Sequence, residues 1–260
     1  MNLSANTLFH ITPKIEFLEN ILTNGFAPRY CIEEIGFFTP FTNGSEMVAQ
    51  PMVCFCDIGL ASISEHVNKY GFFGLGMTKE WGSSKGISPV TYVYEHSSTA
   101  DLIRFILWKT FEMKVSDESN QFLGLLQILK NYYKSSKGHM YKDGKFQDKL
   151  YNFYDEREWR YVPFGEIEKA ASKIPEIRAF LEKEIFDNID IRENNNSILQ
   201  EHCSLKFNYK DIKYIFVKTN EDFERLSDFI EQNYLRNQSK SVQRNMIGKI
   251  QVMENLMEDI

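Results

Sequence analysis

Apolar and polar positions follow a strand-like pattern at the start of the chain and then a helical one. Residues 7–12 alternate as a strand does, with Leu8, His10 and Thr12 on one face. The next apolar positions recur at helical spacing as far as Asn24-Gly25, a sequence typical of a helix end. We therefore predict a strand followed by a helix that ends at Asn24-Gly25, with Thr12 as the N-cap of the helix.

The same reading extends along the chain. Apolar and β-branched segments predict further strands at 51–57, 89–95, 157–162, 205–209 and 213–217. Helical spacing predicts helices at 60–69 and 221–234 and a helical insertion over about 99–150. The fold class is α+β: a split, mixed or antiparallel sheet with helices on its flanks, forming a single domain over residues 1–234.

Residues 235–260 are predicted to form a C-terminal amphipathic helix. Four basic residues and no acid lie between Gln232 and Met253. The helix is expected to pack on its own domain, or to bind a partner or a second copy in a homodimer. Its apolar stripe consists of Val242, Met246, Ile250, Met253 and Met257.

Composition narrows the class of protein. The chain of 260 residues is 43% hydrophobic and 25% charged, as in soluble globular proteins. A net charge of -6 disfavours a surface wholly devoted to nucleic acid, although a local basic groove remains compatible with it. Four cysteines without CxxC spacing and an N-terminus without signal-peptide features predict a cytoplasmic protein with reduced thiols. No membrane span is predicted, because no stretch approaches the roughly 18 to 20 uninterrupted apolar residues that a span needs.

The densest polar cluster runs from Asp155 to Tyr161. On a strand, Glu158 and Arg160 share one face. One interpretation is a solvated ladder of ion pairs. The other is a functional carboxylate, since aromatic residues around the cluster could remove Glu158 from water.

Three other features have both a structural and a functional interpretation. His10 is either a core histidine bonded to the backbone or a ligand-binding group. Cys54 and Cys56 are better explained as small buried residues than as zinc ligands, so no metal is predicted. Gly71, Gly74 and Gly76 have the composition of a phosphate loop but not its spacing.

Two family resemblances follow from these motifs. The segment Leu8-Phe-His-Ile-Thr12 before a helix ending Asn-Gly, with Glu156-x-Glu158 on a late strand, resembles the ADP-ribosyltransferase-like fold, particularly its DarT-like branch. Over about residues 7–220 the chain more closely resembles the AbiGi family of abortive-infection, phage-resistance antitoxins. That second resemblance adds Pro28-Arg-Tyr-Cys31, Pro51-Met-Val-Cys-Phe-Cys-Asp57, Thr78-Lys-Glu-Trp81 and Tyr154-Asp-Glu-Arg-Glu-Trp-Arg-Tyr161.

The transferase resemblance implies NAD as a substrate. Glu158 takes the place of the carboxylate that holds the nicotinamide ribose, and Glu156 that of the residue that helps to select the acceptor. A preorganised carboxylate suits this chemistry, because loss of nicotinamide leaves an oxocarbenium-like sugar. A second-strand motif of small hydroxyl residues is absent, and Cys54-Phe-Cys56 stands near its place.

The remaining NAD contacts are implied by position. His10 takes the ribose-binding role with help from Thr12. Tyr70 is the candidate for stacking on nicotinamide, with Tyr30 and Tyr92 as alternatives. The resemblance implies that Arg29 binds the phosphates of NAD, with Arg160 as the alternative.

Three functions follow as hypotheses. The first is a phage-defence transferase that moves ADP-ribose from NAD to a protein or nucleic-acid acceptor. The second is a catalytically silent antitoxin that neutralises a partner toxin by contact, and the third is a nucleotide-binding protein. The transferase requires His10 and Glu158 in one cleft, whereas the antitoxin requires an exposed apolar patch.

Overall fold

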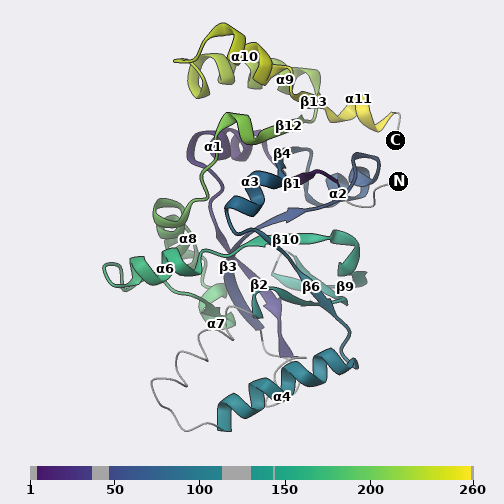
Figure 1. Cartoon of the computed structure of the whole chain (residues 1–260), viewed down its shortest axis with the longest axis vertical. Coiled ribbons are helices and arrows are strands. Elements are labelled where there is room, and N and C mark those ends of the chain that lie inside the picture. The colour runs from purple at the N-terminus through teal and green to yellow at the C-terminus, as the bar shows by residue number, and fades with distance from the viewer. Residues whose placement is uncertain (1–4, 37–46, 113–129, 143, 259–260) are drawn as a thin grey trace. The chain divides into compact units, whose positions relative to one another are not determined.

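The computed structural model describes residues 5–36, 47–112, 130–142 and 144–258. Contacts within the chain divide it into two compact units. Unit 1 comprises residues 1–27, 54–87 and 204–260, and unit 2 comprises residues 28–53 and 88–203. Both units combine helices with strands, which confirms the α+β class (Figure 1).

Unit 1 contains a mixed sheet in the strand order β13-β12-β4-β1. Only β12 and β13 run parallel, and the other neighbours are antiparallel. Cys56, at the end of β3, pairs with Phe9 of β1. The strands are β1 (Thr7–Thr12), β3 (Met47–Cys56), β4 (Phe73–Thr78), β12 (Ile212–Val217) and β13 (Ile250–Val252).

Helices accompany these strands, and a core cluster joins the two. Phe9, Phe216 and Met253 are almost fully buried in that cluster, together with Ile63 and Val67 of α2. The helices are α1 (Ile15–Asn24), α2 (Ile63–Tyr70) after a 3-10 turn at Leu60–Ser62, α3 (Lys79–Ser84), α9 (Asn220–Phe229) with a π-helical end at Ile230–Tyr234, α10 (Lys240–Ile247) and α11 (Met253–Met257).

Unit 2 contains the larger part of β3, which pairs antiparallel with β2 and β11. Strand β10 pairs with β5, while β6 with β7 and β8 with β9 form two separate two-stranded sheets. The strands are β2 (Arg29–Glu34), β5 (Ser88–Pro89), β6 (Thr91–Val93), β7 (Tyr133–Ser135), β8 (Lys137–Lys142), β9 (Lys145–Asn152), β10 (Glu158–Tyr161) and β11 (Leu181–Glu182).

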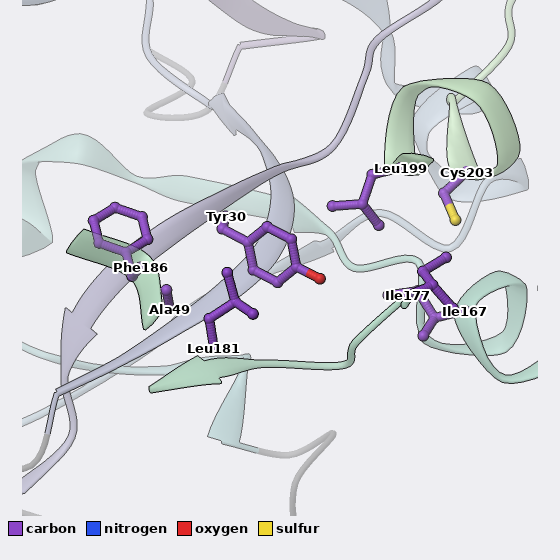
Figure 2. Packing of buried hydrophobic residues seen from close by; sticks show 8 residues of the cluster. All are labelled: Tyr30, Ala49, Ile167, Ile177, Leu181, Phe186, Leu199 and Cys203. Carbon is purple, nitrogen blue, oxygen red and sulfur yellow. The ribbon is translucent and has the colours of Figure 1, made fainter. Parts of the chain in front are cut away.

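One core cluster of unit 2 packs helices on the strands β2, β3 and β11. Tyr30, Ala49 and Leu181 from the strands meet Leu199 and Cys203 from α8 (Figure 2). A smaller cluster places Ala100 and Leu107 of α4 against Val93. The helices are α4 (Ser98–Glu112), α6 (Phe164–Ala171), α7 (Lys183–Asp187) and α8 (Ile189–Cys203).

The predicted strand at 7–12 and the helix that ends at Asn24 are confirmed. The predicted N-cap is wrong: Thr12 still pairs with Phe73 in the sheet, and Lys14 precedes the helix without a side-chain cap. Gly25 follows the helix with φ of 79°, a conformation that favours glycine.

The helical insertion predicted for about 99–150 is only partly helical. Helix α4 covers 98–112, and residues 113–129 of the predicted insertion lie outside the described residues. Residues 133–135 and 137–152 form strands. Six of the eight positions of β9 are exposed, so this ribbon lacks the apolar alternation by which strands are recognised.

The prediction of a single C-terminal helix over residues 235–260 is also wrong. Helix α10 ends at Ile247, Ile250–Val252 joins the sheet beside β12, and a short helix follows. Met246, Ile250 and Met253 of the predicted stripe are nevertheless buried. Burial of these residues is compatible with one long helix and with the observed helix, strand and helix. Pairing with β12 is what makes Ile250–Val252 a strand.

The predicted strand at 205–209 is wrong as well. Leu205 forms a single bridge with Phe26, and Tyr209–Asp211 form a 3-10 turn. The side chain of Asn208 and that of Asp211 cap this turn reciprocally. Such local hydrogen bonds compete with strand pairing for the same backbone groups.

Candidate functional site

Arg160 lies at the centre of a buried ionic cluster in unit 2 and has no exposed surface. Its Nε donates to Oε1 of Glu158 at 2.7 Å, and Nη2 donates to Oε2 at 3.1 Å. Nη1 and Nη2 also donate to the carboxylate of Glu33, and Nη1 donates to the main-chain oxygen of Asn131 at 2.7 Å. Each of the five N–H donors of the guanidinium therefore has an acceptor.

Lys134 is the second cation of this cluster. Its Nζ donates to Oε2 of Glu158 at 2.8 Å and to Oε2 of Glu156 at 3.2 Å. The same atom lies 3.8 Å from Oε1 of Glu33 and 4.5 Å from the ring centre of Phe153. Two cations thus meet three carboxylates, and the ionised cluster carries one net negative charge.

The chain geometry brings both predicted carboxylates to Lys134. Glu156 ends a 3-10 turn at Phe153–Glu156, and Arg157 then adopts φ of 43°, which is unusual for a residue with a side chain. Glu158 begins β10, and its N–H donates to the hydroxyl oxygen of Tyr92 at 2.8 Å. The Glu-x-Glu motif therefore directs two side chains towards one lysine.

Electrostatics keep these groups charged. Burial by itself would raise the pKa of Glu158, but the charges and hydrogen bonds of Arg160 and Lys134 lower it well below its usual range. Burial would likewise lower the pKa of Lys134, yet the three carboxylates raise it well above its usual value. Burial also raises the pKa of Tyr92, so its hydroxyl stays protonated.

The cluster is therefore not the solvated ladder of ion pairs that was one interpretation of residues 155–161. Glu158 and Arg160 do share a face of β10, as predicted, but that face is buried. Both oxygens of Glu158 accept hydrogen bonds from cations. Glu158 thus joins β10 to β7 through Lys134, and Arg160 joins β10 to β2 through Glu33. A substrate hydroxyl would have to compete with Arg160 or Lys134 for the carboxylate of Glu158.

His10 lies in unit 1, whereas Glu158 lies in unit 2. Nδ1 of His10 is 2.8 Å from the main-chain oxygen of Cys54. The imidazole packs edge-on against Phe26 and near Phe55, with ring centres 5.1 and 5.7 Å away. Burial lowers its pKa, so the neutral form is favoured, as in a core histidine. A cleft shared with Glu158 stays a prediction.

The other predicted NAD contacts also have defined surroundings. Thr12 is buried in β1 opposite Phe73, and Tyr70 ends α2 with its ring 4.7 Å from that of His66. Arg29 donates to Glu193 of α8 at 2.6 Å, and both side chains are about half exposed. The alternative Tyr30 is buried and donates its hydroxyl proton to the main-chain oxygen of Arg178.

The structure thus brings Glu156, Glu158 and Arg160 together with two residues that the sequence did not indicate, Glu33 and Lys134. These two belong to β2 and β7, far from the motif in sequence. No local pattern marks either residue, because only the tertiary structure of unit 2 makes them neighbours of the motif.

Two surface recesses are described, one in each unit. A recess of about 400 Å³ lies between the start of α9 and β13, and one of about 310 Å³ lies beside Ser97 and Lys137. Neither is lined by any residue predicted to bind NAD. Both tyrosine alternatives, Tyr30 and Tyr92, are likewise absent from their linings.

The cysteines and glycines that the sequence singled out lie in strands or directly after a helix. Within the described ranges, no group of three or more His, Cys, Asp or Glu residues could hold a metal ion. Cys56 is buried in the core of unit 1. Gly71 follows α2 with φ of 123°, and Gly74 and Gly76 lie in β4 beside β1. The described part of the chain also has no helix of the length and apolarity that crossing a membrane requires.

Comparison with known proteins identifies the family. Residues 24–218 match the model of a family described as "Putative abortive phage resistance protein AbiGi, antitoxin". A protein of Lactococcus lactis subsp. cremoris named abortive phage resistance protein AbiGi is 28% identical over 251 residues, which cover 90% of this chain and 99% of that protein. No solved structure matches the chain. Since the family model spans most of the sequence, the chain belongs to the AbiGi family of abortive phage resistance proteins.

Proposed function

We propose that this protein is the antitoxin of an abortive-infection system and neutralises a cognate toxin by direct protein-protein contact. The family description supports the antitoxin role. The observation that carries the contact mechanism is an apolar surface on α4, the outer face, which consists of Leu102, Phe105 and Trp108.

The two sides of α4 are both apolar. Ala100 and Leu107 are buried against Val93, with Ile103 packed beside them. On the opposite side, Leu102, Phe105 and Trp108 follow at intervals of three residues and are 58%, 53% and 36% exposed. A helix that needed only to cover its own unit would carry polar residues there.

This composition suits a protein interface. Aromatic residues are enriched at the centres of interfaces, and tryptophan is common among the residues that dominate binding energy. The rings of Phe105 and Trp108 lie 6.1 Å apart, and Nζ of Lys109 is 4.1 Å from the centre of the Trp108 ring. A toxin surface that accepts an apolar helix face with a cation at its edge fits this arrangement.

The ionic cluster favours this function over ADP-ribose transfer. A catalytic carboxylate must be available to the ribose and to the developing positive charge. The carboxylate of Glu158 already faces two cations, which would oppose a third positive charge beside it. Transfer of ADP-ribose from NAD therefore remains the alternative, and the experiment below includes an arm for it.

The test is growth rescue of cells that express the cognate toxin. We expect wild type and Phe17→Ser to rescue growth, and Leu102→Ser/Phe105→Ser to lose rescue and to stop co-purifying with the toxin. Phe17 is a matched control because it is an aromatic residue of α1 that is 48% exposed. Thermal unfolding of each variant establishes that the fold is retained.

Two results would contradict the proposal. One is full rescue by the α4 double variant, which would place the contact elsewhere. The other is NAD consumption by the purified wild-type protein with loss of both consumption and protection in a folded Glu158→Gln variant, which would support the transferase.

A further inference from the structure

The C-terminal helix α10 has one buried and one exposed side. Gln243 and Met246 are 2% and 1% exposed. Nε2 of Gln243 donates to the main-chain oxygens of Leu235 at 2.9 Å and Glu231 at 3.3 Å. These contacts hold α10 against the π-helical end of α9 within unit 1 (Figure 1), and packing thereby fixes which side meets solvent.

The solvent side of α10 and of the turn before it is cationic and polar. We call it the basic face, and it consists of five exposed residues. The fourth cation of this segment, Lys249, is not part of this face, because it is partly buried and its Nζ donates to the main-chain oxygen of Ile212 at 2.6 Å. The five are Arg236, Lys240, Ser241, Arg244 and Asn245.

Stability of the helix does not account for this arrangement. Lys240 is the first residue of α10, where a cation opposes the helix dipole. Lys240 and Arg244 are one turn apart, where like charges repel. A single ion pair, from Lys240 to Glu231 at 3.3 Å, offsets this, and both partners are exposed. The face is basic although the whole chain has a net charge of -6.

We propose that the basic face binds double-stranded DNA. Lysine and arginine neutralise backbone phosphates, and arginine and asparagine side chains match the edges of guanine and adenine. An α-helix fits the major groove of B-form DNA, whereas the corresponding groove of double-stranded RNA is too narrow to admit side chains. The supporting turn and π-helical end leave the exposed side of α10 available to such a groove.

This inference is independent of toxin binding, which we place on α4. It also agrees with the composition, because a net negative charge disfavours a nucleic-acid surface over the whole protein but is compatible with one confined to a short helix.

The test is fluorescence anisotropy with a labelled DNA duplex of about 20 base pairs, which spans two helical turns. We expect wild type to bind with an affinity that falls as salt rises, with a log-log slope of about -3 for three cations. Lys240→Glu/Arg244→Glu should weaken binding at least tenfold and reduce the slope by about two. Both side chains point to solvent, so the variant should fold, which circular dichroism verifies.

The control is Lys145→Glu/Lys149→Glu, which makes the same change in net charge at exposed positions of β9. Retained binding by this control, together with weaker binding of duplex RNA and poly-glutamate, supports the proposal. Equal losses in both double variants would overturn it as an effect of total charge. No salt-dependent binding by wild type, or tighter binding of poly-glutamate than of DNA, would overturn it as well.

Discussion

Glu158 and Arg160, two positions apart on β10, form a buried ion pair with two hydrogen bonds of 2.7 and 3.1 Å. The pair is completed from two other strands, by Glu33 of β2 and Lys134 of β7. The segment of the Glu156-x-Glu158 motif therefore connects three strands. The strength of these ion pairs can be measured through the free energy of unfolding.

Replacing Arg160 by methionine should destabilise the protein strongly. The change leaves Lys134 alone with three carboxylates, two of which, Glu156 and Glu158, are buried. Breaking a buried ion pair by removing one partner typically costs about 3–5 kcal/mol. Urea unfolding would measure the loss. The matched control is Arg29→Met, whose pair with Glu193 is half exposed and should contribute about 1 kcal/mol or less. Similar losses in both variants would show that the cluster is not a special source of stability.

The cluster should also make stability sensitive to acid. The pKa of Glu158 is lowered by folding, so its contribution is complete above the unfolded pKa of about 4.3 and is lost as pH falls below it. The pKa of Lys134 is raised, so its contribution persists up to about pH 10 and is lost only above. We expect the free energy of unfolding to fall with acid below about pH 4.3, and to fall less in Glu158→Gln. An unchanged acid dependence in that variant would contradict this linkage.

Gln243 should stabilise the C-terminal part of unit 1. Its amide serves two main-chain oxygens at the π-helical end of α9, so Gln243→Leu leaves both without this donor, at a cost of about 1–3 kcal/mol. Thermal unfolding would measure the cost, and hydrogen exchange would place it at residues 230–247. Gln238→Leu, at an exposed position, serves as the control and should change stability little. Equal effects of the two changes would show that the two hydrogen bonds of Gln243 do not stabilise this part of unit 1.

Gly74 should tolerate no side chain. A Cβ at this position would lie 2.3 Å from the main-chain oxygen of His10, so Gly74→Ala must displace β4 from β1. We expect a loss of about 1–3 kcal/mol, the usual cost of overpacking. Gly59→Ala is the control because a Cβ there meets nothing within 4 Å. Equal stability of the two variants would show that the two strands separate easily.

The amino-acid sequence determined the local elements whose apolar side is buried in a regular pattern. The strand at 7–12 and the helix that ends at Asn24 were predicted because alternation and helical spacing record burial on one side. The sequence also placed Glu158 and Arg160 on one face of a strand, which depends only on the two-residue period of β structure.

Tertiary structure decided the rest. The ribbon of β8 and β9 has little apolar patterning because most of β9 is exposed, and the stripe from Val242 to Met257 suits either a helix or a strand until β12 pairs with Ile250. The ionic cluster around Glu158 is completed by Lys134, which pairs with Glu158, and by Glu33, which pairs with Arg160; both are remote from the motif in sequence. Whether a carboxylate is free or held between cations depends on such distant neighbours, because burial and Coulomb interactions act through space and leave no local periodicity.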